Sequence, residues 1–226
     1  MSEAQTTAIV GVGNIGGPLA RHLRRGGEPV VLAAHDAAHA KALARELRPF
    51  ARAASVEDAI AESDVVVFAL WLDDMRKVIP QQARLLEGKV VVDPSNPVSY
   101  ATGSPVRTLP EEQSSASVVA GLLPPSAHYV KAFGTLAAPS LAGEAFREPH
   151  RAVLFYAADD EVGATTAERL IRVAGFEPLK AGGVDVAGRL EMPGGDLHQF
   201  GLNGEILDLD QARAALARNV TATRSG

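Results

Sequence analysis

The sequence contains no cysteine and no long hydrophobic run, and it has fewer basic than acidic residues. Without cysteine, the chain has no disulfide, no thiolate nucleophile and no thiolate-bound metal site. No apolar segment approaches the roughly 18 residues that a membrane-spanning helix needs. A formal net charge of −5 argues against a general nucleic-acid or anionic-membrane binder. We therefore expect neither a nucleic-acid nor a membrane partner.

Three common catalytic motifs are also missing. His35 and His39 lie four residues apart, but Asp36 and Ala37 follow His35, so the sequence lacks the His-Glu-x-x-His zinc motif. It also lacks the Gly-x-Ser-x-Gly nucleophile elbow and the Gly-x-x-x-x-Gly-Lys-Ser/Thr phosphate loop. The sequence therefore predicts no metal site and argues against a hydrolase or a P-loop enzyme.

The start of the chain bears on its location. Residues 1–5 lead directly into an apolar stretch, without the basic segment, apolar segment and small-residue cleavage site of a secretory signal. This beginning favours a cytoplasmic protein. A hydrophobic content of 46% and a charged content of 22% are typical of soluble globular domains.

The first recognisable unit that the sequence does contain is a β-α-β unit. Thr6–Val12 is rich in β-branched residues and broken by glycine, as a buried strand that enters a tight turn should be. An amphipathic helix is predicted over 16–25, and the Gly-Gly-Glu-Pro stretch at 26–29 ends it before a strand over 30–33.

The turn of this unit carries Gly11-Val12-Gly13-Asn14-Ile15-Gly16, which matches the dinucleotide fingerprint Gly-x-Gly-x-x-Gly. Gly11 permits the tight turn, Gly13 lets backbone N–H groups approach a pyrophosphate, and Gly16 lets the helix pack against the strand. Because the motif opens a predicted helix, the phosphates would meet the positive helix N-terminus. We therefore predict NAD or NADP as the cofactor, bound by Gly11, Gly13, Asn14, Ile15 and Gly16.

Strands and helices alternate along the rest of the chain. Further helices are predicted at 37–47, 55–62, 114–123, 161–174 and 208–218, and further strands at 65–70, 90–92, 129–133, 152–156 and 176–179. This alternation predicts an α/β fold of the Rossmann type, with a doubly wound, mostly parallel sheet and a small C-terminal extension. We expect one domain over 1–226, with a dinucleotide-binding core at 1–125 and a sheet extension, acceptor pocket and C-terminal helix at 126–226.

The residues after the second strand bear on the choice between NAD and NADP. Asp36 lies about twenty residues beyond Gly16, where a carboxylate binds the ribose hydroxyls of NAD. His35, if protonated, would instead help to bind a 2′-phosphate. Asp36 could also act only as the N-cap of the helix that starts at Ala37. These alternatives stay open.

Taken together, several motifs resemble one family, the coenzyme F420-dependent NADP oxidoreductases and their bacterial dinucleotide-binding relatives. The resemblance rests on Gly11–Gly16, Val91–Pro97 and Val130–Leu136. Gly188–Glu191 and Gly195–Gly201 resemble the C-terminal signature of the bacterial branch. The cytoplasmic domain of the STEAP metalloreductases is more distantly similar. The resemblance implies an oxidoreductase that uses NADP and forms a homodimer.

The resemblance also implies where the two substrates bind. Positions beside the nicotinamide are Ala69, Leu70, Trp71, Asn96 and Pro97, and those of the electron-acceptor pocket are Phe133, Gly134 and Thr135. Trp71 could also be only a partly buried packing residue. His198 is a further candidate for the pocket and the candidate catalytic residue, because it lies among glycines near Asp196, which could orient it; a surface or interface histidine is the equal alternative.

Two positions depart from the family pattern. Relatives that use NADP have Ser or Thr and an Arg where this chain has Ala34, His35 and Asp36, so the preference for NADP stays open. Relatives often have Asn or His after the phenylalanine, where this chain has Gly134, so F420 as the acceptor also stays open.

We expect an NAD(P)H-dependent oxidoreductase that transfers hydride to F420, a flavin or another small acceptor. One alternative is an imine or ketone reductase, in which His198, Tyr129 or Ser95 would donate a proton. Another is a dinucleotide-binding sensor without turnover, which the missing side chain at Gly134 favours.

Overall fold

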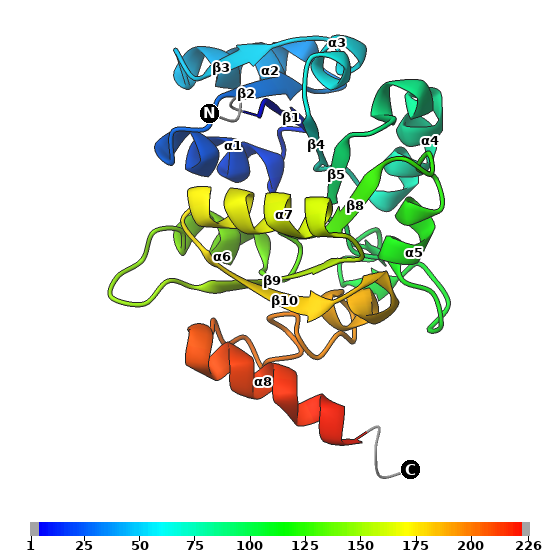
Figure 1. Ribbon diagram of the computed structural model, residues 1–226, viewed down its shortest axis with the longest axis vertical. Helices are drawn as coiled ribbons and strands as arrows, with labels where there is room; N and C mark the ends of the chain where they lie inside the picture. The colour runs from blue at the N-terminus through cyan, green and yellow to red at the C-terminus, as the bar shows by residue number, and fades with distance from the viewer. Residues whose placement is uncertain (1–4, 223–226) are drawn as a thin grey trace.

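The computed structural model describes residues 5–222, which fold into a twisted eight-stranded sheet with helices on both faces (Figure 1). The first half contains β1 (Thr7–Val10), α1 (Gly16–Arg25), β2 (Val30–Ala33), α2 (Ala37–Glu46), β3 (Ala51–Ala53), α3 (Val56–Ala61), β4 (Val65–Phe68), α4 (Leu72–Gln81), the 3-10 helix η1 (Ala83–Leu86) and β5 (Val90–Asp93). The second half contains β6 (Val98–Ser99), β7 (Val106–Arg107), α5 (Ser115–Ala120), β8 (His128–Lys131), α6 (Ala138–Gly143), β9 (Val153–Ala158), α7 (Glu161–Val173), β10 (Glu177–Gly182), the 3-10 helix η2 (Val184–Leu190) and α8 (Leu209–Ala222).

The strands of the sheet follow the order β3-β2-β1-β4-β5-β8-β9-β10. All neighbouring pairs are parallel except β8 and β9, so the prediction of a mostly parallel α/β sheet is confirmed. The chain winds outward from β1 to β3 in one direction and from β4 onward in the other. This reversal between β1 and β4 creates the crevice where open α/β sheets bind ligands.

The central strands are apolar on both faces because helices cover both faces of the sheet. Every residue of β1, β2, β4, β5 and β9 is buried. One core cluster includes Leu23 of α1 and Leu170 of α7, and the cluster on the other face includes Met75 of α4 and Val119 of α5. The valine-rich runs at 65–68 and 90–92 therefore form the centre of the sheet.

The sequence prediction missed β3, α4 and α6, as well as the short strands β6 and β7 and the 3-10 helices η1 and η2. Pro80 lies in the last turn of α4, and Asp73 and Asp74 lie in its first turn. The helix forms because Met75 and Ile79 of its apolar stripe are buried in the core, which outweighs its low intrinsic helix propensity. The C-terminal helix also extends beyond the predicted end near Arg218, to Ala222.

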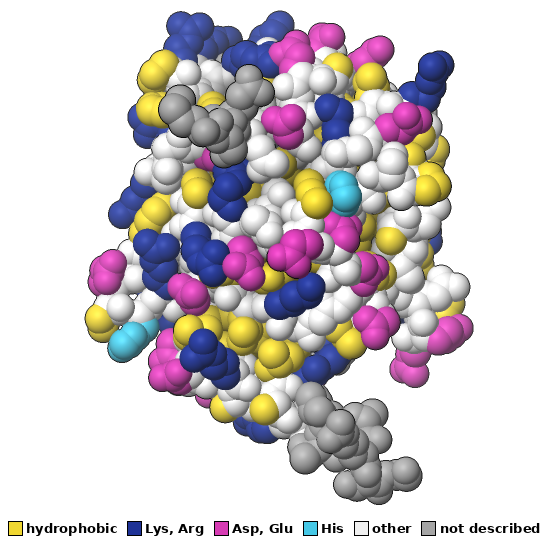
Figure 2. Space-filling view, viewed as in Figure 1, with side chains coloured by type: hydrophobic (Ala, Val, Ile, Leu, Met, Phe, Trp, Pro, Cys, Tyr) yellow, Lys and Arg dark blue, Asp and Glu magenta, His cyan; other side chains and the backbone are white. Residues whose placement is uncertain are grey.

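Figure 2 shows the face that α7 covers, on which acidic and basic side chains are interspersed. On α7 itself, Arg169 pairs with Glu28 at 2.6 Å and Arg172 pairs with Glu168 at 3.0 Å. Within residues 5–222, no helix is long and apolar enough to cross a membrane.

Candidate functional site

Two glycines of the fingerprint are required by the packing of the turn against β4. Gly11 has a φ of +97°, and a Cβ there would lie 2.3 Å from the carbonyl oxygen of Ala69. A Cβ at Gly16 would lie 1.9 Å from the carbonyl oxygen of Gly11. Gly13 differs, because no described atom lies within 4 Å of the position that its Cβ would take. The turn therefore has room for a ligand directly above Gly13.

The N-terminus of α1 lies next to this space and carries no side-chain cap. In the part of the chain that the structure describes, its N-cap Ile15 makes no side-chain hydrogen bond, and its first turn holds no acidic residue. By contrast, α3 and α7 are capped by Ser55 and Asp160 and have acidic residues in their first turns. The positive end of α1 is thus left without a neutralising group, which suits a phosphate. The residues present fit the pyrophosphate of a dinucleotide.

At the end of β2, Asp36 is the N-cap of α2. Its Oδ1 accepts a hydrogen bond from the backbone N–H of Ala38 at 2.8 Å, and its Oδ2 lies 3.8 Å from Nδ1 of His39. His35 and Asp36 are exposed. One carboxylate oxygen is therefore used by the helix, and the other faces solvent beside His39, where a ribose could reach it.

Of the three positions expected after β4, two contact the glycine turn. The Ala69 carbonyl and a Leu70 methyl group lie closest to the Cβ position of Gly11. Trp71 follows as the N-cap of α4, and its side chain is 58% exposed. The ring of Trp71 lies 6.3 Å from the ring of Tyr100, a residue that the sequence analysis did not single out.

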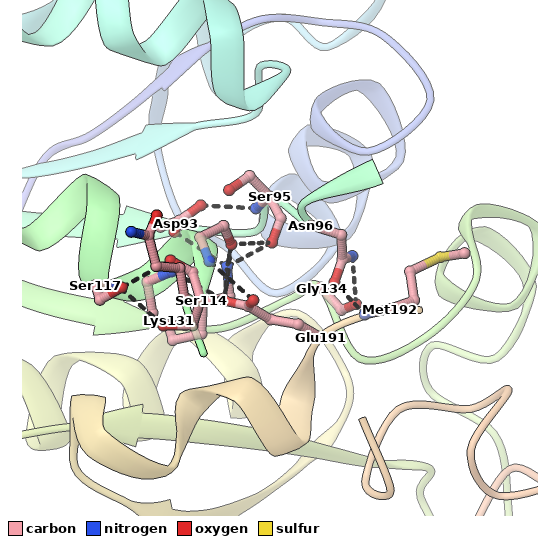
Figure 3. A network of polar contacts seen from close by, with 12 residues as sticks. Asp93, Ser95, Asn96, Ser114, Ser117, Lys131, Gly134, Glu191 and Met192 are labelled. Carbon is pink, nitrogen blue, oxygen red and sulfur yellow. Dashed lines mark hydrogen bonds and ion pairs between the residues drawn. The ribbon is translucent and has the colours of Figure 1, made fainter. Parts of the chain in front are cut away.

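Asn96 connects three segments of the chain through hydrogen bonds of its side-chain amide (Figure 3). Its Nδ2 donates to the carbonyl oxygen of Gly134 at 3.1 Å, and its Oδ1 accepts from the backbone N–H of Met192 at 2.8 Å. Pro97, the next residue, accepts from the backbone N–H of Thr108 at 2.9 Å. The loop after β5 is thus fixed to the loop after β8 and to the C-terminal segment.

Gly134 has a structural reason to be glycine. A Cβ there would lie 2.6 Å from the carbonyl oxygen of Pro94, so the two loops approach too closely for a side chain. Phe133, just before it, has a φ of +64°, which is strained for a bulky residue. The tight fit of these loops, rather than the loss of a binding side chain, explains the glycine.

Beneath these loops, Lys131 is the centre of a buried polar network (Figure 3). Its Nζ lies 3.1 Å from Oδ2 of Asp93, 3.3 Å from Oε1 of Glu191 and 2.7 Å from Oγ of Ser115, and it also donates to the carbonyl oxygen of Ser95. Lys131, Asp93, Glu191 and Ser115 are all at most 1% exposed. The ammonium thus joins β5, β8, α5 and the C-terminal segment.

Both carboxylates of this network are satisfied by further donors. Glu191 accepts from the backbone N–H groups of Ser115 and Ala116, each at 2.9 Å. Asp93 accepts from the backbone N–H of Ser95 and from the hydroxyl of Tyr129, each at 2.7 Å. Burial, and then the charge of Asp93, raise the pKa of Tyr129 well above its usual value. Tyr129 therefore holds its proton in a hydrogen bond to Asp93.

Sequence reasoning missed this network, although one signal of it was present. Asp93 and Lys131 are charged residues at the ends of otherwise apolar strands, and such residues are buried only when they are paired. Nothing local shows that Glu191, from the C-terminal signature, would join them.

Three side chains expected in the acceptor pocket are buried. Phe133 is 0%, Thr135 3% and His198 1% exposed. The C-terminal segment that contains His198 is joined to the loop after β8, because the backbone N–H of Gln199 donates to the carbonyl oxygen of Thr135 at 2.8 Å. The side chains of Phe133, Thr135 and His198 are therefore enclosed by the fold.

His198 has a defined environment. Its Nδ1 accepts from the backbone N–H of Phe200 at 3.1 Å, which places the proton of the neutral ring on Nε2. Asp196, expected to orient it, makes a bidentate ion pair with Arg189 at 2.8–3.0 Å. Burial lowers the pKa of His198 to about 4, so the imidazole is neutral at pH 7.

The burial of His198 predicts a pH-dependent stability. Its pKa is about 4 when folded and 6.5 as a free group, so between these values only the unfolded chain takes up the proton. The free energy of unfolding should therefore fall as the pH falls through this range, by about 1.4 kcal/mol per unit. Urea titrations of wild type and His198→Gln at several pH values measure this, and parallel curves for the two proteins would contradict it.

Residues 6–97 match the family described as NADP oxidoreductase, coenzyme F420-dependent, which confirms the resemblance seen in the sequence. None of the curated proteins matches the chain significantly.

Several solved structures have the same fold. A hypothetical protein from Sinorhizobium meliloti is 28% identical, with a TM-score of 0.78 over 90% of this chain and 95% of that one. A candidate F420-dependent NADP reductase from Arthrobacter sp. FB24 is 22% identical, with a TM-score of 0.68 over 82% of this chain and 90% of that one. A reductive aminase from Aspergillus terreus, in complex with NADPH and ethyl levulinate, is 21% identical, with a TM-score of 0.63 over 88% of this chain and 60% of that one. At these last two identities the likeness shows the fold alone.

Proposed function

We propose that the chain, whose residues 6–97 match the F420-dependent NADP oxidoreductases, is an NAD(P)-dependent oxidoreductase that transfers hydride between a nicotinamide and F420, a flavin or another small acceptor. One observation carries the proposal. The uncapped N-terminus of α1 and the open space at Gly13 lie together at the point where the strand order reverses. A dinucleotide bound there would place its nicotinamide over the ends of β4 and β5.

The surrounding side chains suit an acceptor that takes hydride without a proton from the protein. Hydride transfer between two rings depends on their close stacking and on exclusion of water. Tyr129 is bonded to Asp93 and has a raised pKa, and His198 is buried and neutral. Neither is suited to act as a general acid near pH 7.

One observation favours imine or ketone reduction as the second candidate. The hydroxyl of Ser95 is buried and has no hydrogen-bond partner among the residues that the structure describes. In Figure 3 the side chain of Ser95 points away from the Lys131 network. An unpartnered hydroxyl at a strand end could donate a hydrogen bond to a substrate carbonyl or imine.

A sensor without turnover is less well supported. Its main support was the missing side chain at Gly134, and the close approach of Pro94 now accounts for that glycine. The absence of a polar side chain at this position is therefore explained by packing.

The experiment that tests the proposal follows the loss of nicotinamide absorbance. NADH and NADPH are each mixed with F420, FMN, FAD, a quinone, a ketone and a cyclic imine. Turnover with F420, a flavin or a quinone at a rate that stays constant from about pH 6 to pH 8 supports the proposal. Turnover with the imine or ketone alone, at a rate that Ser95→Ala lowers, supports the second candidate, and tight dinucleotide binding without any turnover would support a sensor.

Asp36 is expected to select against NADPH. Its second carboxylate oxygen, Oδ2, would face a 2′-phosphate, and such a like-charge contact weakens binding by about tenfold or more. Asp36→Ser removes the charge but keeps an oxygen that can cap α2, whereas Asp36→Ala also removes the cap and should lower stability by about 1 kcal/mol. Both variants should bind NADPH more tightly and NADH more weakly than wild type. Unchanged affinities in both would leave Asp36 as a helix cap only.

A further inference from the structure

Two large aromatic side chains lie together, Trp71 in the connection after β4 and Tyr100 in the segment that follows β5. Trp71 is 58% exposed and Tyr100 is 47% exposed, and their ring centroids are 6.3 Å apart at an interplanar angle of 63°. Trp71 is the only tryptophan in the chain. Exposing two large rings side by side leaves apolar surface in water, which is typical of a binding surface.

The pair is attached to the polar network at the strand ends. The hydroxyl of Tyr100 lies 3.7 Å from the sulfur of Met192, and the backbone N–H of Met192 donates to Asn96 at 2.8 Å. Figure 3 shows the hydrogen bonds that join the side chain of Asn96 to Gly134 and to Met192. Tyr100, in the connection from β6 to β7, is thus held over the loop that follows β5.

The position of Trp71 is fixed from the other side. Leu70 contacts the turn at Gly11, and Trp71 follows it as the first residue before α4. The pair is therefore connected to the glycine turn on one side and to the loop at Asn96 on the other. The side chains first expected to contact the acceptor, Phe133, Thr135 and His198, are all buried.

We infer that Trp71 and Tyr100 determine acceptor specificity by holding a flat conjugated ring against the outer face of the nicotinamide. This inference rests on the proposed function. For hydride transfer the nicotinamide and the acceptor ring must approach to about 3–3.5 Å. One face of the acceptor then lies on the nicotinamide, and its edges or its other face lie toward Trp71 and Tyr100. Exposed indole and phenol rings bind such a ring well and bind a small aliphatic ketone poorly.

The test measures binding of riboflavin, which carries no phosphate and so does not compete for the N-terminus of α1. The protein is first saturated with NADP⁺ or NAD⁺, and quenching of riboflavin fluorescence then gives a Kd for wild type, Trp71→Leu, Tyr100→Leu and Tyr100→Phe. The Kd should rise about five- to tenfold in each leucine variant and stay near the wild-type value in Tyr100→Phe. Phe50→Leu, which alters a 41% exposed ring next to β3, is the matched control and should change nothing.

Three results would overturn the inference. The first is no binding of riboflavin to the wild type, and the second is an unchanged riboflavin Kd in both leucine variants. The third is a loss of dinucleotide affinity with an unchanged riboflavin Kd, which would mean that Trp71 and Tyr100 hold the nicotinamide instead. Circular dichroism checks that each variant is folded. Riboflavin binding that depends on the pair, in a protein that oxidises no nicotinamide, would instead count against the proposed function alone.

Discussion

A Gly13→Val protein is expected to fold like wild type and to lose dinucleotide binding by at least about a hundredfold. A Cβ at position 13 would meet no described atom within 4 Å, so the fold has room for a side chain there. The same space is where a pyrophosphate would approach the backbone N–H groups, and a branched side chain there excludes it. Fluorescence titration with NADH and NADPH measures the affinity, and urea titration measures the stability.

Two other glycines serve as controls for this experiment. Gly16→Val should destabilise the protein by several kcal/mol, because its Cβ would lie 1.9 Å from the Gly11 carbonyl oxygen and the backbone must move. Gly143→Val, at the end of α6 and also in open space, should leave dinucleotide affinity unchanged. If a folded Gly13→Val protein bound the dinucleotide as tightly as wild type, the proposed phosphate site would be wrong.

Lys131→Met is expected to lower the free energy of unfolding by about 3–5 kcal/mol. The change removes the ammonium that lies 3.1 Å from Asp93 and 3.3 Å from Glu191, and it leaves two buried carboxylates without a counter-charge. Their remaining hydrogen-bond donors are backbone N–H groups and hydroxyls, which do not compensate for the loss of a positive charge in a low-dielectric interior. Chemical denaturation at neutral pH measures the loss.

Two further variants show whether buried charge is the cause. Adding Glu191→Gln to Lys131→Met removes one of the unpaired charges and should restore part of the stability, so the two changes should be non-additive. Arg76→Met, which breaks an exposed ion pair with Asp73 at 3.2 Å, should cost less than about 1 kcal/mol. A loss in Lys131→Met as small as that in Arg76→Met would show that the network contributes little.

The network also connects stability to the proposed chemistry. Lys131 fixes the loop after β5, and the amide of Asn96 in that loop holds Gly134 and Met192. Met192 in turn contacts the hydroxyl of Tyr100. Removing the charge of Lys131 should therefore disturb the position of Tyr100 as well as the core.

By itself, the sequence determined the glycine turn, the first β-α-β unit and the class of the sheet. These features depend on local signals, because glycines at fixed spacing allow the turn and unbroken runs of valine are buried only between two layers of helices. The family could also be recognised from the sequence alone, because its motifs are short and continuous. Helix α4 was missed because its helical pattern is short and is interrupted by Pro80.

Only the tertiary structure decided which residues surround the site. Lys131 and Asp93 are 38 residues apart, and Ser115 and Glu191 are 76 apart, so no local pattern could show that they meet. In the sequence, the glycine at position 134 suggested that a binding side chain was missing. In the fold, Gly134 lies too close to Pro94 for any side chain. The burial of His198 and the exposure of Trp71 beside Tyr100 were equally unpredictable. The physical reason is that strand order and the path of the C-terminal segment, which are set by packing over the whole chain, determine which side chains leave water and which remain at the surface.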